Sequence, residues 1–180
     1  VGDPSAVASG DYPYLFYGEY GYAGVYDSAT YDPVKEWAGQ CVSVARIALK
    51  DLDDPQGKGK RWDGKAFEAP WNGIGMPISS RQIPRAEGGG PQSSATGGFH
   101  WGPSVSWNTY LNCWVMLMGK VTGTSWKGST MWISFNMNKD LTEGENSQQW
   151  SKPQLLLDRG PGHTVWYPSL QPMDTKEDIE

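Results

Sequence analysis

An internal repeat constrains the fold of this sequence more than any other feature. Four features recur in the same order, which chance matching rarely preserves: a Pro-Ser dipeptide, an apolar run ending in Gly, a segment ending in Lys-Asp-Leu, and a Trp. The aligned segments are Gly2–Gly18 with Trp101–Gly119, Cys41–Leu52 with Thr130–Leu141, and the flanks of Trp62 with those of Trp150. A third copy begins at Trp166–Leu170.

Each copy is typical of a small antiparallel sheet. We expect the residue before each repeated Pro to be extended, because Pro pushes its predecessor into the β region. The runs Tyr12–Tyr17 and Cys113–Met118 are continuously apolar, which predicts strands that are covered on both faces. Met131–Asn136 alternates between two faces, and a Trp-led segment supplies the last strand, where Pro153 suits a sheet edge.

Four strands repeated in this order predict an all-β fold, a β-propeller with two blades and the first strand of a third. A propeller closes with roughly four to eight blades. We therefore expect a fragment of a longer propeller, the alternative being that another chain supplies the remaining blades. The predicted divisions are a first blade with a long loop insertion in 1–72, a Gly/Pro/Ser-rich loop in 73–98, a second blade in 99–162, and the start of a third blade with a charged tail in 163–180.

Charge and cysteine content exclude several classes of function. Lys and Arg total 15 against 20 Asp and Glu, a net charge of -5 with no basic cluster, so binding to nucleic acid is disfavoured. No stretch approaches the ~18 apolar residues of a membrane span, so we expect no membrane association. Two Cys make neither a disulfide scaffold nor a four-ligand zinc site. Cys41 and Cys113 are interpreted as buried free thiols, with one bridge as the alternative in an exported protein.

Several stretches together resemble a known family. They are GDPS-x-V-x-x-GDY-x-YLFY, VSVAR, W-x-G-K-x-F, HWGPSVSWN, ISF, KDL, W-x-x-P-x-LL and WYPSL. The sequence is similar to the five-bladed β-propeller glycoside hydrolases, especially the furanosidase-type group that includes glycoside hydrolase family 43 and its uncharacterised bacterial relatives. The resemblance covers both repeats. It implies a secreted or periplasmic protein that acts on the glycosidic bonds of poly- or oligosaccharides.

The resemblance also implies catalytic residues at the propeller's central mouth. Hydrolysis there needs two carboxylates, commonly ~6.5 to 9.5 Å apart for inversion. Asp3 matches the family's Asp-Pro position and is the implied general base; the alternative is that Asp3 only turns the chain before Pro4. The family's general acid has no counterpart at Trp101, so the acid is expected on blades absent from this chain. Glu68 is interpreted as structural, and Glu87, in a loop, is a weaker candidate acid.

Four more residues are expected to bind substrate. His100, Trp101, Trp166 and Tyr167 flank the starts of the second and third copies. Aromatic faces stack on the C–H surfaces of sugars, although packing between blades explains such rings equally well. His100 has several open roles: a bond to sugar hydroxyls, orientation of a carboxylate, contact with a central cation or water, or a purely structural role. No cofactor is indicated by the residues themselves; Ca2+ at the propeller axis is an open alternative drawn from the resemblance.

The leading hypothesis is therefore a glycoside hydrolase-like propeller with Asp3 as general base. Its partners would be a carbohydrate and the remaining blades. One alternative is a non-catalytic carbohydrate-binding propeller, and another is a structural fragment without a ligand. Motifs for other chemistry are absent: the sequence has no G-x-S-x-G elbow, no phosphate-binding loop and no His-x-x-x-His pair.

Overall fold

The computed structural model describes residues 2–19, 41–71, 78–80, 100–121, 129–142, 144 and 147–170. Within these ranges the regular structure consists of strands and one short 3-10 helix, Leu49–Asp51. The strands of the first repeat and the following segment are β1 (Gly2–Ser9), β2 (Tyr12–Glu19), β3 (Cys41–Arg46), β4 (Lys60–Arg61), β5 (Ala69–Pro70) and β6 (Ser79–Ser80). Those of the second repeat are β7 (His100–Asn108), β8 (Cys113–Val121), β9 (Ser129–Asn136), β10 (Gln149–Trp150) and β11 (Gln154–Leu157).

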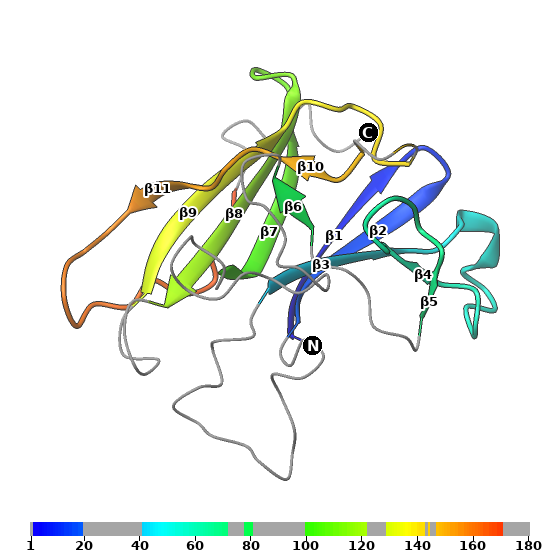
Figure 1. Cartoon of the computed structure of the whole chain (residues 1–180), viewed down its shortest axis with the longest axis horizontal. Helices are drawn as coiled ribbons and strands as arrows, with labels where there is room; N and C mark the ends of the chain where they lie inside the picture. Colours follow the sequence, from blue (N-terminus) through cyan, green and yellow to red (C-terminus); the bar gives the residue numbers. More distant parts are fainter. Residues whose placement is uncertain are drawn as a thin grey trace, which may run out of the picture.

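The strands form two main antiparallel sheets, which confirms the all-β prediction. The first sheet has the order β1-β2-β3-β4-β5 and the second has the order β11-β9-β8-β7. Both sheets are therefore built from successive neighbours that begin at the first strand of each repeat. Figure 1 shows the two sheets side by side, with β1 and β7 close together between them. Pro153 immediately precedes β11, which lies at the sheet edge as the sequence predicts.

The predicted loop 73–98 contributes a short strand. Of this range the structure describes 78–80, and Ser79–Ser80 forms β6, which pairs in parallel with β10. The amide of Ile78 also donates a hydrogen bond to the carbonyl oxygen of Val42 at 3.0 Å. The segment between the repeats is thus tied to both of them.

Local residue types explain the two main hairpins. Only Gly10 and Asp11 lie between the paired residues Ser9 and Tyr12, and Gly10 has a φ of 57°, as a tight hairpin turn requires. The hairpin between β7 and β8 has a longer loop. There the side-chain oxygen of Asn108 accepts a hydrogen bond from the amide of Leu111 at 2.8 Å. Asn112 ends that loop with a φ of 52°, a conformation that Asn tolerates.

The residue before each repeated Pro is not extended, so that prediction was wrong. Asp3, Gly102 and Tyr167 have φ values of 51°, 58° and 50°. In the first two cases the cause is a β-bulge, which sets two residues of the first strand opposite one residue of its partner. We call the three tripeptides that contain these residues the Pro-Ser motifs: Asp3-Pro4-Ser5, Gly102-Pro103-Ser104 and Tyr167-Pro168-Ser169.

The hydrophobic core lies between the two sheets. One ring contact across it joins Phe16 to Trp150, with ring centroids 5.7 Å apart and planes nearly perpendicular. A polar contact beside it joins Ser5 and Val105, since the Ser5 hydroxyl oxygen accepts a hydrogen bond from the Val105 amide at 2.9 Å. The buried core residues are Tyr14, Phe16, Val42, Val44, Trp62, Phe67, Val105, Trp114, Met116, Met118, Leu141 and Trp150.

The two repeats bring opposite faces to this core. Tyr14 and Phe16 of β2 face it, and their aligned positions in β8 are Val115 and Leu117. In β8, however, the core-facing residues are the alternate ones, such as Met116, while Val115 and Leu117 are buried on the other face. The sheets therefore stack head to tail: the face that β2 turns to the core is the opposite of the face that β8 turns to it. The burial of β8 from Cys113 to Gly119 also confirms that this apolar run is covered on both faces.

Arg46 links the first repeat to the second. Its guanidinium lies 4.1 Å from the ring centroid of Tyr12 and 4.5 Å from that of Phe67. It also donates a hydrogen bond to the carbonyl oxygen of Thr142 at 2.7 Å and one to the hydroxyl of Tyr14 at 3.4 Å. Burial raises the pKa of Tyr14 to about 12, with the nearby Arg46 acting in the opposite direction.

Candidate functional site

The Pro-Ser motifs converge at one end of the two sheets. A Cβ placed on Gly102 would lie 3.8 Å from the Cβ of Asp3 and 3.9 Å from its Oδ2. The preceding residue, Trp101, contacts the third motif: its ring centroid lies 5.1 Å from that of Trp166 and 6.0 Å from that of Tyr167. The structure thus brings Asp3 and three of the aromatic and histidine candidates into one continuous row.

The rings in this row differ sharply in exposure. Trp101 is only 1% exposed, whereas Trp166 is 41% and Tyr167 is 64% exposed. Trp101 packs so closely on Gly119 that a Cβ there would lie 2.9 Å from Cε2 of the indole. Trp101 therefore acts as a packed support in this structure, and Trp166 and Tyr167 provide the aromatic surface that faces solvent.

Backbone strain is concentrated in the same row. Asp3 and Tyr167 have left-handed φ values, which cost a non-glycine residue of order 1–3 kcal/mol. Such strain persists only where the surroundings hold it, and it clusters at functional sites. Asp3 and Tyr167 are two of the three non-glycine residues with positive φ in the described part of the chain. The third, Asn112, ends the loop between β7 and β8.

His100 lies at the same end of β7 as Trp101, but its side chain lies on the opposite face of the strand. It is buried, with its ring centroid 5.3 Å from that of Trp132 in an edge-to-face arrangement. Opposite His100 in the ladder is Lys120, whose ammonium lies 4.9 Å above the Trp132 ring. Burial lowers the pKa of Lys120 below its ordinary value.

Of the two glutamates considered as general acid, the structure describes Glu68, which is not part of this row. Glu68 is exposed and precedes β5, which lies at the opposite edge of the first sheet from β1. Glu87 lies outside the described residues. Asp3 itself is partly buried in the first Pro-Ser motif. A hydrolase built on this row needs its general acid from a part of the protein that the structure does not describe.

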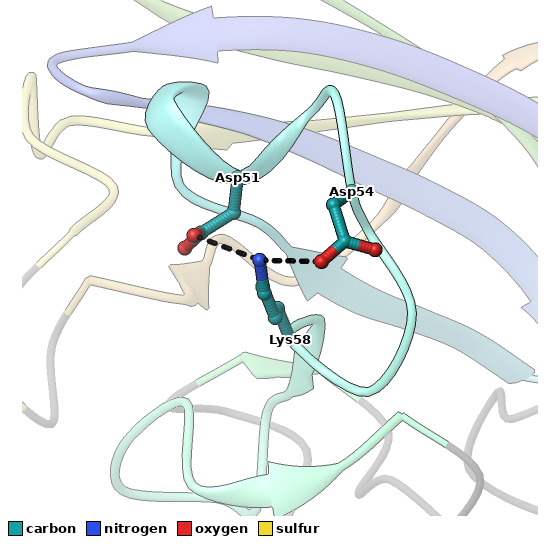
Figure 2. Close-up of polar contacts among 3 residues, drawn as sticks. All are labelled: Asp51, Asp54 and Lys58. Carbon is teal, nitrogen blue, oxygen red and sulfur yellow. Dashed lines mark hydrogen bonds and ion pairs between the residues drawn. The ribbon is translucent and has the colours of Figure 1, made fainter.

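No group of three or more His, Cys, Asp or Glu that could hold a metal ion occurs among the described residues. In the Asp-rich turn after β3, two of the carboxylates form ion pairs with a lysine. Figure 2 shows the ammonium of Lys58 between the carboxylates of Asp51 and Asp54, with N···O distances of 3.6 and 3.1 Å. These surface ion pairs give Asp51 and Asp54 a structural partner.

Cys113 is a buried free thiol, and burial raises its pKa. It pairs with Asn108 at the end of β7 opposite to the Pro-Ser motif. The side chain of Cys41 lies outside the described residues. Within the described ranges, no helix has the length and apolar character needed to cross a membrane.

Gly119, on which Trp101 packs, and its neighbour Lys120 were not candidates in the sequence. Gly119 ends the apolar run of the second copy, and Gly18 ends the aligned run of the first copy. The repeated glycine was therefore a sequence signal that could have identified Gly119. Lys120 directly follows Gly119, and nothing in the sequence marks it apart from that position. Comparison with known proteins gave no match to a family profile, to a curated protein or to a solved structure.

Proposed function

We propose that the two sheets are consecutive blades of a β-propeller. The head-to-tail stacking supports this proposal, because each sheet of a propeller turns one face to the preceding blade and the opposite face to the following one. The adjacency of β1 and β7 gives further support, since these are the first strands of their repeats and would line the central channel. The third Pro-Ser motif, in contact with Trp101, is where a third blade would start.

We further propose that the row of Pro-Ser motifs binds carbohydrate. The observation that carries this proposal is the convergence of the Asp3 carboxylate with the exposed rings of Trp166 and Tyr167, through Gly102 and Trp101. Sugars present an apolar C–H face together with a rim of hydroxyls. Aromatic rings can stack on the C–H face, and a carboxylate can accept hydrogen bonds from the hydroxyls.

In the leading form of the proposal the protein hydrolyses glycosidic bonds. Asp3 acts as the general base that activates water, and blades outside this chain supply the general acid. Secretion or export to the periplasm, where polysaccharides are encountered, belongs to the same proposal. The second candidate is a non-catalytic carbohydrate-binding propeller. It is favoured by the fact that Asp3 is the only carboxylate that the described structure places in the row.

The test combines glycan binding with hydrolysis. Binding to a glycan array and release of reducing sugar from a panel of poly- and oligosaccharides are measured for this chain together with the remaining blades, as wild type, Asp3→Asn and Asp11→Asn. Asn tolerates a left-handed φ, so Asp3→Asn should fold normally. Asp11 is an exposed matched control in the turn at the other end of the same hairpin.

The hydrolase proposal predicts that Asp3→Asn loses hydrolysis by a factor of about 100 or more while it still binds glycans, and that Asp11→Asn behaves as wild type. Glycan binding by wild type with no hydrolysis of any substrate would favour the second candidate. Absence of both binding and hydrolysis would refute both.

A further inference from the structure

Gly102 is the residue against which the Asp3 side chain lies. In the repeat, Gly102 occupies the place in the second Pro-Ser motif that Asp3 occupies in the first and Tyr167 in the third. A Cβ placed on Gly102 would lie 3.8 Å from the Cβ of Asp3 and 3.9 Å from its Oδ2. Any side chain at position 102 would therefore begin in contact with the carboxylate that is proposed as general base.

The backbone conformation does not by itself require glycine at this position. The φ of Gly102, 58°, is in the left-handed region that favours glycine. However, Asp3 and Tyr167 have φ values of 51° and 50° at the equivalent positions of the other motifs, and both carry side chains. Asp3 and Gly102 also lie in equivalent register shifts of their strands. The fold therefore accommodates a side chain in this conformation.

Contact with Asp3 does not exclude a Cβ either. Carbon atoms in contact prefer separations of about 3.5–4.0 Å, and both distances to Asp3 fall in that range. Gly119 is different, because a Cβ there would lie only 2.9 Å from the indole of Trp101. At position 102 it is the atoms beyond the Cβ that would interfere. They would extend from a point 3.9 Å from Oδ2, and a hydroxyl or water must approach that oxygen to within about 2.5–3.0 Å to form a hydrogen bond.

We propose that Gly102 is a positioning residue of the carbohydrate site, whose lack of a side chain lets a sugar hydroxyl, or the water to be activated, reach Oδ2 of Asp3. The proposal rests on the carbohydrate site proposed above and specifies how its carboxylate is reached. Because Gly102 acts through Asp3, a side chain at position 102 weakens binding only while the Asp3 carboxylate is present. The three equivalent positions then have distinct roles: Asp3 provides the carboxylate, Gly102 the access to it, and Tyr167 an exposed ring.

A first experiment tests the contact without any ligand. The Cβ separation of 3.8 Å matches the mean of about 3.8 Å in disulfides. The double variant Asp3→Cys with Gly102→Cys should therefore form a bridge under mild oxidation, which peptide mapping by mass spectrometry detects. The control is Asp3→Cys with Gly10→Cys, since Gly10 lies beyond the other end of β1. No bridge between positions 3 and 102, or equal bridging in the control, would overturn the inference.

A second experiment tests whether residue 102 acts through Asp3. Affinities for xylohexaose and for a linear arabino-oligosaccharide are measured by calorimetry, with this chain together with the remaining blades. The variants are Gly102→Asn, Asp3→Gly and the two combined, because Asn tolerates a left-handed φ. The matched control is Gly10→Asn: Gly10 has a φ of 57°, and a Cβ there would lie 3.8 Å from Cγ2 of Thr142. Thermal unfolding verifies that each variant folds.

We expect Gly102→Asn to lower the affinity about fivefold or more, as loss of a hydrogen bond to a charged group allows, and Gly10→Asn to bind as wild type. In the Asp3→Gly background, Gly102→Asn should change the affinity less than about twofold. Equal losses in the two backgrounds, or equal behaviour of Gly102→Asn and Gly10→Asn, would overturn the inference and leave the carbohydrate site intact.

A smaller substitution keeps the inference testable if Gly102→Asn does not fold. Gly102→Ala adds only the Cβ, so it should fold and show a smaller loss of affinity with the same dependence on Asp3. Unfolding of both Gly102→Ala and Gly102→Asn would show that the fold itself needs this glycine, and would overturn the inference. Binding of neither sugar by wild type would overturn the inference together with the carbohydrate site.

Discussion

The packing of Trp101 on Gly119 is the contact on which the aromatic part of the site depends. A Cβ on residue 119 would lie 2.9 Å from Cε2, 3.0 Å from Cζ2 and 3.2 Å from Nε1 of the indole. Carbon atoms in contact prefer separations of about 3.5–4.0 Å. In Gly119→Ala the ring of Trp101 must therefore shift by several tenths of an ångström or more, and its contacts with Trp166 and Tyr167 must change with it.

The expected cost follows from overpacking. Trp101 is fully buried, so it has no solvent-filled space in which to relax. Extra atoms in a well-packed interior cost about 1–3 kcal/mol. For a chain of this size each kcal/mol lowers Tm by roughly 2–4 °C. We expect Gly119→Ala to unfold about 2–12 °C below wild type, with a change in the near-ultraviolet circular dichroism of the Trp101, Trp166 and Tyr167 cluster.

A double-mutant cycle separates this contact from a general intolerance of Ala in β8. Trp101→Phe leaves a smaller ring, so Gly119→Ala should cost less in the Trp101→Phe background than in wild type. The difference in unfolding free energy should reach about 1 kcal/mol. Unchanged Tm in Gly119→Ala, or strictly additive effects of the two substitutions, would refute the proposed packing of Trp101.

Two further predictions concern interactions between and within the repeats. Arg46→Met removes a charge-assisted hydrogen bond to Thr142 and two ring contacts, and should lower the unfolding free energy by about 2–3 kcal/mol in chemical denaturation. Lys58→Met, at an exposed ion pair, should lower it by less than about 1 kcal/mol. Equal losses in the two variants would contradict the linking role of Arg46. Because burial raises the pKa of Tyr14 to about 12, its contribution to stability is fully present below pH 10 and is lost as pH rises toward 12. Unfolding followed between pH 9 and pH 12 should show a loss of stability that is roughly 2–3 kcal/mol larger in wild type and in the exposed-site control Tyr110→Phe than in Tyr14→Phe. An identical pH profile for all three would argue against this prediction.

The sequence repeat predicted the two sheets correctly because the strands follow one another in the same order in both copies. The strands β1, β2 and β3 correspond in order to β7, β8 and β9, and the aligned Trp62 and Trp150 both lie in the core. A continuous apolar run indicates burial on both faces, so the covering of β8 could be predicted from residue types alone.

The backbone at the Pro-Ser motifs could not be predicted in the same way. The rule that Pro favours an extended predecessor is local, whereas the left-handed φ of Asp3 and Gly102 results from bulges that depend on pairing with a second strand. The repeat did mark Asp3, Gly102 and Tyr167 as equivalent in position, with Trp101 and Trp166 one residue earlier in their copies, and the structure places these residues in one row. It could not distinguish a buried ring from an exposed one, because Trp101 and Trp166 share the pattern Trp-x-Pro-Ser and their burial depends on what packs on them in the fold.

The central claim is that carbohydrate binds where the Pro-Ser motifs converge. The most direct measurement is a crystal structure of the protein with a bound oligosaccharide selected from the glycan array. The account predicts sugar rings on Trp166 and Tyr167 with hydroxyls within hydrogen-bond distance of Asp3. An oligosaccharide bound elsewhere on the protein, with the row of motifs free of sugar, would contradict it.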